Sequence, residues 1–129
     1  KKLATELNVQ GSIIFYNGID QKEMPALYGK TDVFVQAPRK DAIGMVLMEA
    51  MACGCPAVTT DAGSNGDWAN FTVPIDDYEG MARDIIKILK DKKLADELSK
   101  KNINTAKEYF DTEKNMGMIN KRFLELIKC

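Results

Sequence analysis

The sequence contains no histidine, which removes imidazole from the general bases, catalytic partners and metal ligands that this chain could supply. Its three cysteines are an odd number that cannot form a complete disulfide framework, and they favour a reducing, cytoplasmic setting. No apolar run approaches the ~18 residues of a membrane span, and no basic-then-apolar signal peptide opens the chain. Lys plus Arg total 18 and Asp plus Glu total 19, so the net charge of −1 gives no electrostatic footprint for nucleic acid.

The 129 residues correspond to one domain, and the 45% hydrophobic content is typical of a globular protein. Residues 1–7 have the pattern of the end of a helix, with no start Met and no helix cap. We therefore expect the chain to be a piece of a longer protein. Cys53 and Cys55 are interpreted as structural residues at a helix end, and Cys129 as a free terminal thiol.

Four short apolar runs, rich in β-branched and aromatic residues, predict strands at 12–16, 32–36, 57–60 and 71–73. Helical patterns are expected at 20–29 and 44–53, from 76 onward, and at about 94–110 and 112–127. In the last helix, apolar residues at helical spacing are expected to face inward: Met116, Ile119, Phe123, Leu126 and Ile127. The alternation predicts an α/β fold, a Rossmann-like parallel sheet with helices on both faces.

In such sheets ligands bind at the carboxyl ends of the strands, where this chain has loops at 17–20, 37–43 and 61–67. Asp41 precedes the helix at 44–53 and Glu49 lies within it, so the carboxylates are roughly 12 Å apart along the axis. That spacing excludes a proton-sharing dyad but suits the two ends of an extended ligand. Between them, the backbone N–H groups of 43–45 open a helix, which favours an anion. The alternative is that Asp41 only caps the helix and Glu49 is solvated.

The segment 41–56, DAIGMVLMEAMACGCP, closely resembles the signature of retaining glycosyltransferases of the GT-B fold. That signature has an acid, seven residues, Glu, and then Ala-Met-Ala-x-Gly-x-Pro. The segments 24–28, 60–63 and 71–74 resemble flanking parts of the same family. The resemblance covers nearly all of residues 5–127, and it implies a partial C-terminal donor-binding domain whose first two strands precede Lys1.

By this resemblance Asp41 is the catalytic acid that faces the donor sugar, and Glu49 bonds the ribose of a nucleotide-diphosphate sugar. The remaining donor-site residues that it implies are Ile43, Gly44 and Met45 at the sugar or diphosphate, Asn17, Gly18 and Ile19 at the base, and Gly63, Ser64 and Asp67 in the last loop. It implies no bound metal and no cofactor; the sugar nucleotide is a substrate. The acceptor, a glycan, lipid or small molecule, would bind an absent N-terminal domain.

The sequence departs from the family pattern where Asp41 replaces Glu and Asn17 stands at a common Gly. Arg39 and Lys40 do not match the family's diphosphate-binding cations, which come from earlier segments. We therefore expect the chain alone to be inactive. Two alternatives remain, a non-catalytic binding or scaffolding domain of the same fold and a sugar-nucleotide epimerase. The intact protein is expected in the cytoplasm, with peripheral membrane association left open.

The resemblance also predicts topology. The strand at 33–36 should pair in parallel with 57–60, and 57–60 with 71–73. The two strands expected before Lys1 would separate 12–16 from 33–36. Three outcomes are open: those strands belong to the protein outside this chain, another copy supplies them through exposed sheet edges, or 12–16 shifts to pair with 33–36.

Overall fold

A computed structural model describes residues 1–127, and the side chains as far as residue 125. Its centre is a three-stranded parallel sheet in the order β1 (Phe34–Gln36), β2 (Ala57–Thr60), β3 (Phe71–Val73). Val35 is level with Val58, which is level in turn with Phe71. The predicted parallel pairing of these three strands is confirmed.

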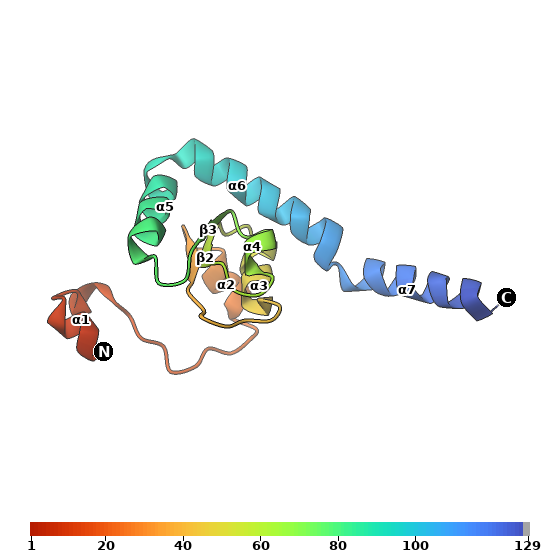
Figure 1. Cartoon of the computed structure of the whole chain (residues 1–129), viewed down its shortest axis with the longest axis horizontal. Coiled ribbons are helices and arrows are strands. Elements are labelled where there is room, and N and C mark those ends of the chain that lie inside the picture. Colours follow the sequence, from red (N-terminus) through yellow and green to blue (C-terminus); the bar gives the residue numbers. More distant parts are fainter. Residues whose placement is uncertain (128–129) are drawn as a thin grey trace.

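The helices surround this sheet and extend beyond it on two sides (Figure 1). They are α1 (Lys2–Glu6), the 3-10 turn η1 (Gln10–Ser12), α2 (Met24–Tyr28), α3 (Met45–Ala52), α4 (Asn65–Trp68), α5 (Tyr78–Lys90), α6 (Lys92–Thr105), the π-helical η2 (Ala106–Phe110) and α7 (Thr112–Ile127). Within the described residues, no helix is both long and apolar enough to cross a membrane.

The central strand β2 is covered on both faces, since all four of its residues are buried. Helices α3, α4 and α5 contact it. Leu47 and Met51 of α3 form one core cluster with Ala57, and Trp68 and Phe110 pack at its margin. A strand whose successive residues are all buried needs such two-sided cover, and the predicted α/β class is confirmed.

Helix α6 is tied to the start of β2 by a buried amide pair. Nδ2 of Asn102 donates to the carbonyl oxygen of Cys55 at 2.6 Å, and Oδ1 of Asn70 accepts from the backbone N–H of Ala57 at 2.8 Å. Gly54, at φ +82°, lets α6 approach closely, because a Cβ there would lie 2.8 Å from Oγ of Ser99. Two polar side chains thereby satisfy the backbone where the chain enters the sheet.

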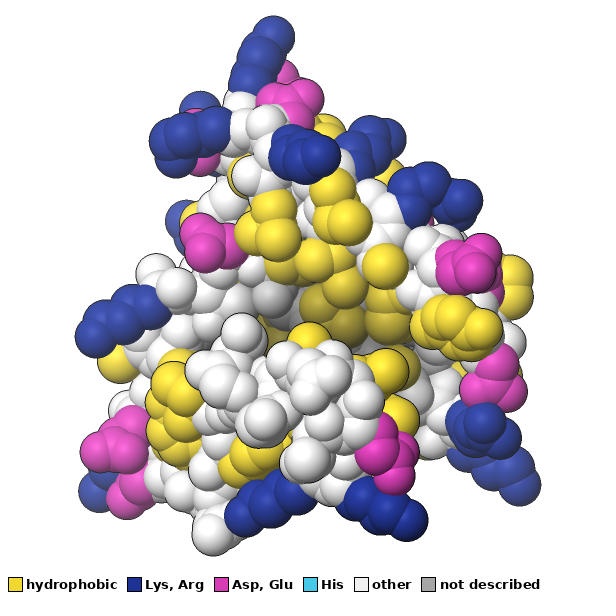
Figure 2. All heavy atoms as spheres, turned by 90° about the vertical axis from the view of Figure 1, so that its left-hand side faces the viewer, with side chains coloured by type: hydrophobic (Ala, Val, Ile, Leu, Met, Phe, Trp, Pro, Cys, Tyr) yellow, Lys and Arg dark blue, Asp and Glu magenta, His cyan; other side chains and the backbone are white. Residues whose placement is uncertain are grey.

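The predicted strand at 12–16 is wrong. Ser12 ends η1, and the following segment runs apart from the sheet to α2 without forming a strand (Figure 1). Ile13 has extended backbone angles (φ −119°, ψ 124°), and the side chain of Ile14 is 78% exposed. Extended residues become a strand only beside a hydrogen-bonding partner, and no described strand lies next to this segment. Figure 2 shows the face on this side, where hydrophobic side chains gather in a hollow rimmed by charged ones.

The inward orientation predicted for the last helix is also wrong where it can be examined. Met116 and Ile119 are each 50% exposed and Phe123 is 62% exposed, because α7 projects from the body (Figure 1). An amphipathic pattern selects a helix face but provides no surface to cover it. The side chains of Leu126 and Ile127, and Cys129, lie outside the described residues.

Other boundaries moved by a few residues. The helix expected over 20–29 is reduced to α2, and Asp20 instead accepts a bond from the N–H of Lys22 at 2.9 Å in a turn. The expected loop 61–67 contains the short helix α4. The helix expected to end at 110 changes to π geometry over η2.

Candidate functional site

Asp41 is the centre of a hydrogen-bond cluster between the end of β1 and the start of α3. Its Oδ2 accepts from Nε2 of Gln36 at 3.0 Å and from Nδ2 of Asn65 at 3.1 Å. Its Oδ1 accepts from the backbone N–H of Gly44 at 3.3 Å. The carboxylate therefore joins the last residue of β1, the first residue of α4 and the N-cap of α3.

Two glycines allow the loops 37–43 and 61–67 to approach this closely. Gly44 has φ +62°, and a Cβ built on it would collide with the Asn65 side-chain amide. Gly63 has φ +61°, and its Cβ would collide with the carbonyl oxygen of Asp41. Oγ of Ser64 donates to the carbonyl oxygen of Ala42 at 3.2 Å. Both positions have the left-handed backbone that glycine adopts without strain.

The pKa of Asp41 is lowered below its ordinary value of 3.8, chiefly by the hydrogen bond from Asn65. Desolvation opposes this effect, and the backbone N–H groups of residues 42–44 add to it. Hydrogen bonds to the charged form of a carboxylate favour ionisation. Asp41 is therefore an anion, and an acceptor, throughout the neutral range.

Glu49 lies in a separate groove between α2 and α3. The pocket there, about 270 Å³ in volume, is lined by Gln21, Met24, Pro25, Tyr28, Glu49, Ala52 and Cys53. Oη of Tyr28 donates to Oε2 of Glu49 at 3.4 Å. The pKa of Tyr28 is raised, first by burial and then by the Glu49 charge, and the pKa of Cys53 is raised by the same two causes. Glu49 thus lies beside the neutral hydroxyl of Tyr28, and the residue is exposed to solvent.

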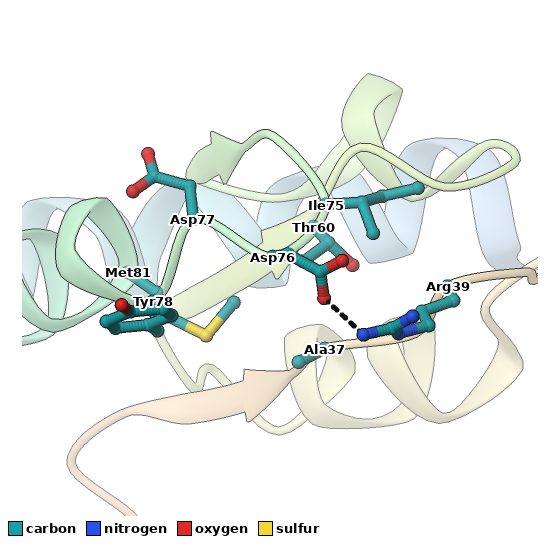
Figure 3. Close-up of a pocket in the computed structure, with 8 residues that line it drawn as sticks. All are labelled: Ala37, Arg39, Thr60, Ile75, Asp76, Asp77, Tyr78 and Met81. Carbon is teal, nitrogen blue, oxygen red and sulfur yellow. Dashed lines mark hydrogen bonds and ion pairs between the residues drawn. The ribbon is translucent and has the colours of Figure 1, made fainter.

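A further pocket lies at the carboxyl edge of the sheet (Figure 3). Ala37, Thr60 and Ile75 follow or end the three strands, and they line it together with Tyr78 and Met81 of α5. Arg39 and Asp76 point toward each other at its mouth and form an ion pair at 2.8 Å. Glu49 does not line this pocket. The side chain of Arg39 is thus engaged with a carboxylate of the same chain.

The structure brings together only part of the predicted site. Asp41, Gly44, Gly63 and Ser64 are in contact, and Ile43 and Met45 are exposed at the start of α3. Asp67 is exposed on α4, and Asn17 is exposed in the N-terminal segment.

Gly18 and Ile19 line a different pocket, together with Ala26 and Leu27 of α2 and with Glu23, which precedes that helix. That pocket shares no residue with the groove of Glu49. The helical positions that face the two pockets lie on opposite sides of α2.

Sequence reasoning missed Gln36 and Asn65, which hold Asp41, and Tyr28, which contacts Glu49. Gln36 did give a signal, because it is the polar residue at the carboxyl end of an apolar strand. Asn65 is 24 residues from Asp41 in the sequence, and no local pattern connects the two.

Comparison with known proteins gives a consistent result. The family described as "Glycosyl transferases group 1" matches residues 1–105. The chain is similar to N-acetyl-alpha-D-glucosaminyl L-malate synthase of Bacillus anthracis, at 25% identity over 98% of this chain and 34% of that protein. It is similar in structure to sucrose-phosphate synthase from Thermosynechococcus elongatus, with a TM-score of 0.84 and 26% identity over 97% of this chain and 33% of that one.

A second solved structure has the same fold. It is the C-terminal domain of a group 1 family glycosyl transferase from Francisella tularensis, with a TM-score of 0.76 and 23% identity. The match covers 86% of this chain and 60% of that one. The chain spans about a third of the length of the first two relatives.

Proposed function

Because the chain belongs to the glycosyl transferases group 1 family, we propose that it is the donor-binding domain of a retaining glycosyltransferase. The complete enzyme transfers a sugar from a nucleotide-diphosphate sugar to an acceptor. The likeness to a C-terminal domain of the same family supports the position of the domain in the enzyme. The proposal rests on two acids, Glu49 on α3 and Asp41 in the loop before it. The carboxylate of each accepts hydrogen bonds from neutral side chains.

Glu49 is the proposed ribose ligand. Its groove between α2 and α3 is mostly apolar, and its carboxylate accepts from the hydroxyl of Tyr28, a neutral donor. A carboxylate without a cationic partner retains acceptor capacity, and two adjacent hydroxyls of a ribose can satisfy it.

Asp41 and the start of α3 are the proposed ligands of the sugar and the diphosphate. The first turn of α3 has no side-chain cap, and its exposed residues Met45 and Val46 offer backbone N–H groups to an anion. Ile43 and Met45 are exposed on either side of the buried Gly44. An ionised Asp41 stabilises positive charge that develops on the donor sugar as its bond to the diphosphate breaks.

The roles of Asn17, Gly18 and Ile19 at the base remain a prediction. In this conformation the pocket that Gly18 and Ile19 line is on the far side of α2 from Glu49. A nucleotide whose ribose reaches Glu49 would contact these residues only after the N-terminal segment moves. The loop residues Gly63, Ser64 and Asp67 keep their proposed place beside the sugar.

The domain alone is proposed to be inactive. An acceptor site must come from the rest of the enzyme, and Arg39 is paired with Asp76 rather than free for a diphosphate. Cations from other segments of the complete enzyme are the proposed diphosphate partners.

Calorimetric titration of the complete enzyme with a panel of uridine and guanosine diphosphate sugars tests donor binding. We expect one of them to bind, and Glu49→Gln to weaken the affinity by about 1–3 kcal/mol, the range for a hydrogen bond with a charged group. Glu97→Gln, an exposed acid on α6, is the matched control and should leave the affinity unchanged. Equal affinity for the Glu49→Gln variant would remove the ribose assignment.

Assay of the complete enzyme tests transfer. The expected product keeps the anomeric configuration of the donor. Donor binding without transfer to any acceptor would instead favour a non-catalytic binding domain of the same fold.

A further inference from the structure

The two amides that hold Asp41 share an unusual feature. In the part of the chain that the structure describes, two buried side-chain oxygens have no hydrogen-bond partner, Oε1 of Gln36 and Oδ1 of Asn65. Both belong to amides whose NH₂ groups donate to the same atom, Oδ2 of Asp41. Buried polar atoms are normally paired, so each exception needs a physical reason.

The reason here is the orientation of the amides. An amide that turned its oxygen toward Asp41 would bring a partial negative charge against the carboxylate. Donation to Asp41 therefore fixes the direction of both NH₂ groups and leaves both oxygens without donors. A site selected for stability alone would avoid such orphaned groups.

The side chain of Asn65 is itself held in place by the residues packed around it. Asn65 is fully buried, and its amide fills the space that a Cβ on Gly44 would need. Asp41 is only partly buried. Three donors from three different elements hold its carboxylate in a defined orientation.

We propose, building on the donor-binding function above, that Asn65 and Gln36 are positioning residues that hold the Asp41 carboxylate for the donor sugar. They act through Asp41 and do not touch the substrate. Asp41 is shorter than the Glu that the family has at this position, and the amides of Gln36 and Asn65 fix where its carboxylate lies. The groups that lower the pKa of Asp41 are neutral donors, with Asn65 first.

The first experiment measures the Asp41 carboxyl resonance of the 129-residue chain by NMR as pH is lowered. In Asn65→Leu the pKa of Asp41 should rise toward its ordinary value. Asn102→Leu removes another fully buried asparagine, far from Asp41 in the fold, and should leave that pKa unchanged. If Asn65→Leu does not fold, the smaller substitution Asn65→Ala removes the same amide and provides the same test. An unchanged Asp41 titration in a folded variant overturns the proposal.

The second experiment uses the complete enzyme. Asn65→Leu should lower kcat about tenfold and change the donor KM by less than about twofold, because a small displacement at the reacting centre costs rate rather than affinity. In an Asp41→Asn background the same substitution should cost nothing further, because it acts through Asp41. Additive losses in kcat overturn the positioning role. If the unmodified enzyme transfers no sugar, the proposed function fails, and the Asp41 titration still decides whether the amides hold the carboxylate.

Discussion

The side-chain amides of Asn70 and Asn102 bond to each other reciprocally. Nδ2 of Asn70 donates to Oδ1 of Asn102 at 2.8 Å, and Nδ2 of Asn102 donates to Oδ1 of Asn70 at 2.9 Å. Together they also satisfy the carbonyl of Cys55 and the N–H of Ala57. This pair of amides thus connects α6 to the N-terminal end of β2.

Asn102→Leu should destabilise the fold by about 2–3 kcal/mol. The substitution leaves the Cys55 carbonyl and part of the Asn70 amide buried without partners, and each unsatisfied group costs about 1–3 kcal/mol. Urea denaturation of the chain measures the change. Asn104→Leu, on the same helix, is the comparison and should have little effect. Equal free energies of unfolding for the two variants would contradict the role of the amide pair.

Asp41→Asn should reduce transfer about a hundredfold while the dissociation constant of the donor changes less than about threefold. The charge acts mainly on the transition state, where the sugar becomes positive. Steady-state kinetics of the complete enzyme and titration of the donor separate the two quantities. Asp96→Asn, an exposed acid on α6, makes the same change of charge and should leave kcat unaltered. An undiminished kcat in Asp41→Asn would mean that this acid only joins the loops at the ends of β1 and β2.

Gly63→Ala should separate the loop 61–67 from the loop 37–43. Its new Cβ would collide with the Asp41 carbonyl, and alanine is strained at φ +61°. A loss of about 1–3 kcal/mol in unfolding free energy is expected. Gly11→Ala is the matched control, because a Cβ there meets nothing within 4 Å. Thermal denaturation of both variants is the measurement, and identical midpoints would refute the close approach.

The stability of the chain should fall between pH 9 and pH 11. Burial raises the pKa of the Cys55 thiol from 9.0 to about 11, and the thiol donates to the carbonyl of Tyr28 at 2.9 Å. The folded state then keeps a proton that the unfolded state loses, so the contribution is complete below pH 9 and lost as pH rises to 11. The loss is about 3 kcal/mol. Unfolding free energies measured across this range should decline less in Cys55→Ala than in the unmodified chain. An equal decline in both proteins would show that the Cys55 thiol does not cause the loss.

Local patterns were enough to predict most of the sheet. The strands at 57–60 and 71–73 have the predicted bounds, because each is a short run rich in β-branched residues that begins directly after Pro56 or Asn70. The helix at 44–53 was predicted to within one residue at each end, since Gly44 and Gly54 mark its limits. The resemblance of 41–56 to a glycosyltransferase signature led to a family that the comparison bears out.

Long-range contacts decided what the sequence left open. The residues 12–16 have the composition of a strand but no neighbouring strand to bond, and the apolar face of α7 has no described surface against it. The partners of Asp41 come from β1 and α4, and Asn65 reaches it across 24 residues.

The sequence by itself thus determined the parallel order of the three strands, the limits of α3 and the two acids of the proposed site. The tertiary structure decided which side chains surround each acid, because hydrogen bonds between distant loops depend on how those loops pack. It also separated the groove of Glu49 from the pocket at the strand ends. The spacing of residues along a helix determines the distances between them within that helix. It does not show which residues of other elements will lie beside them in a site.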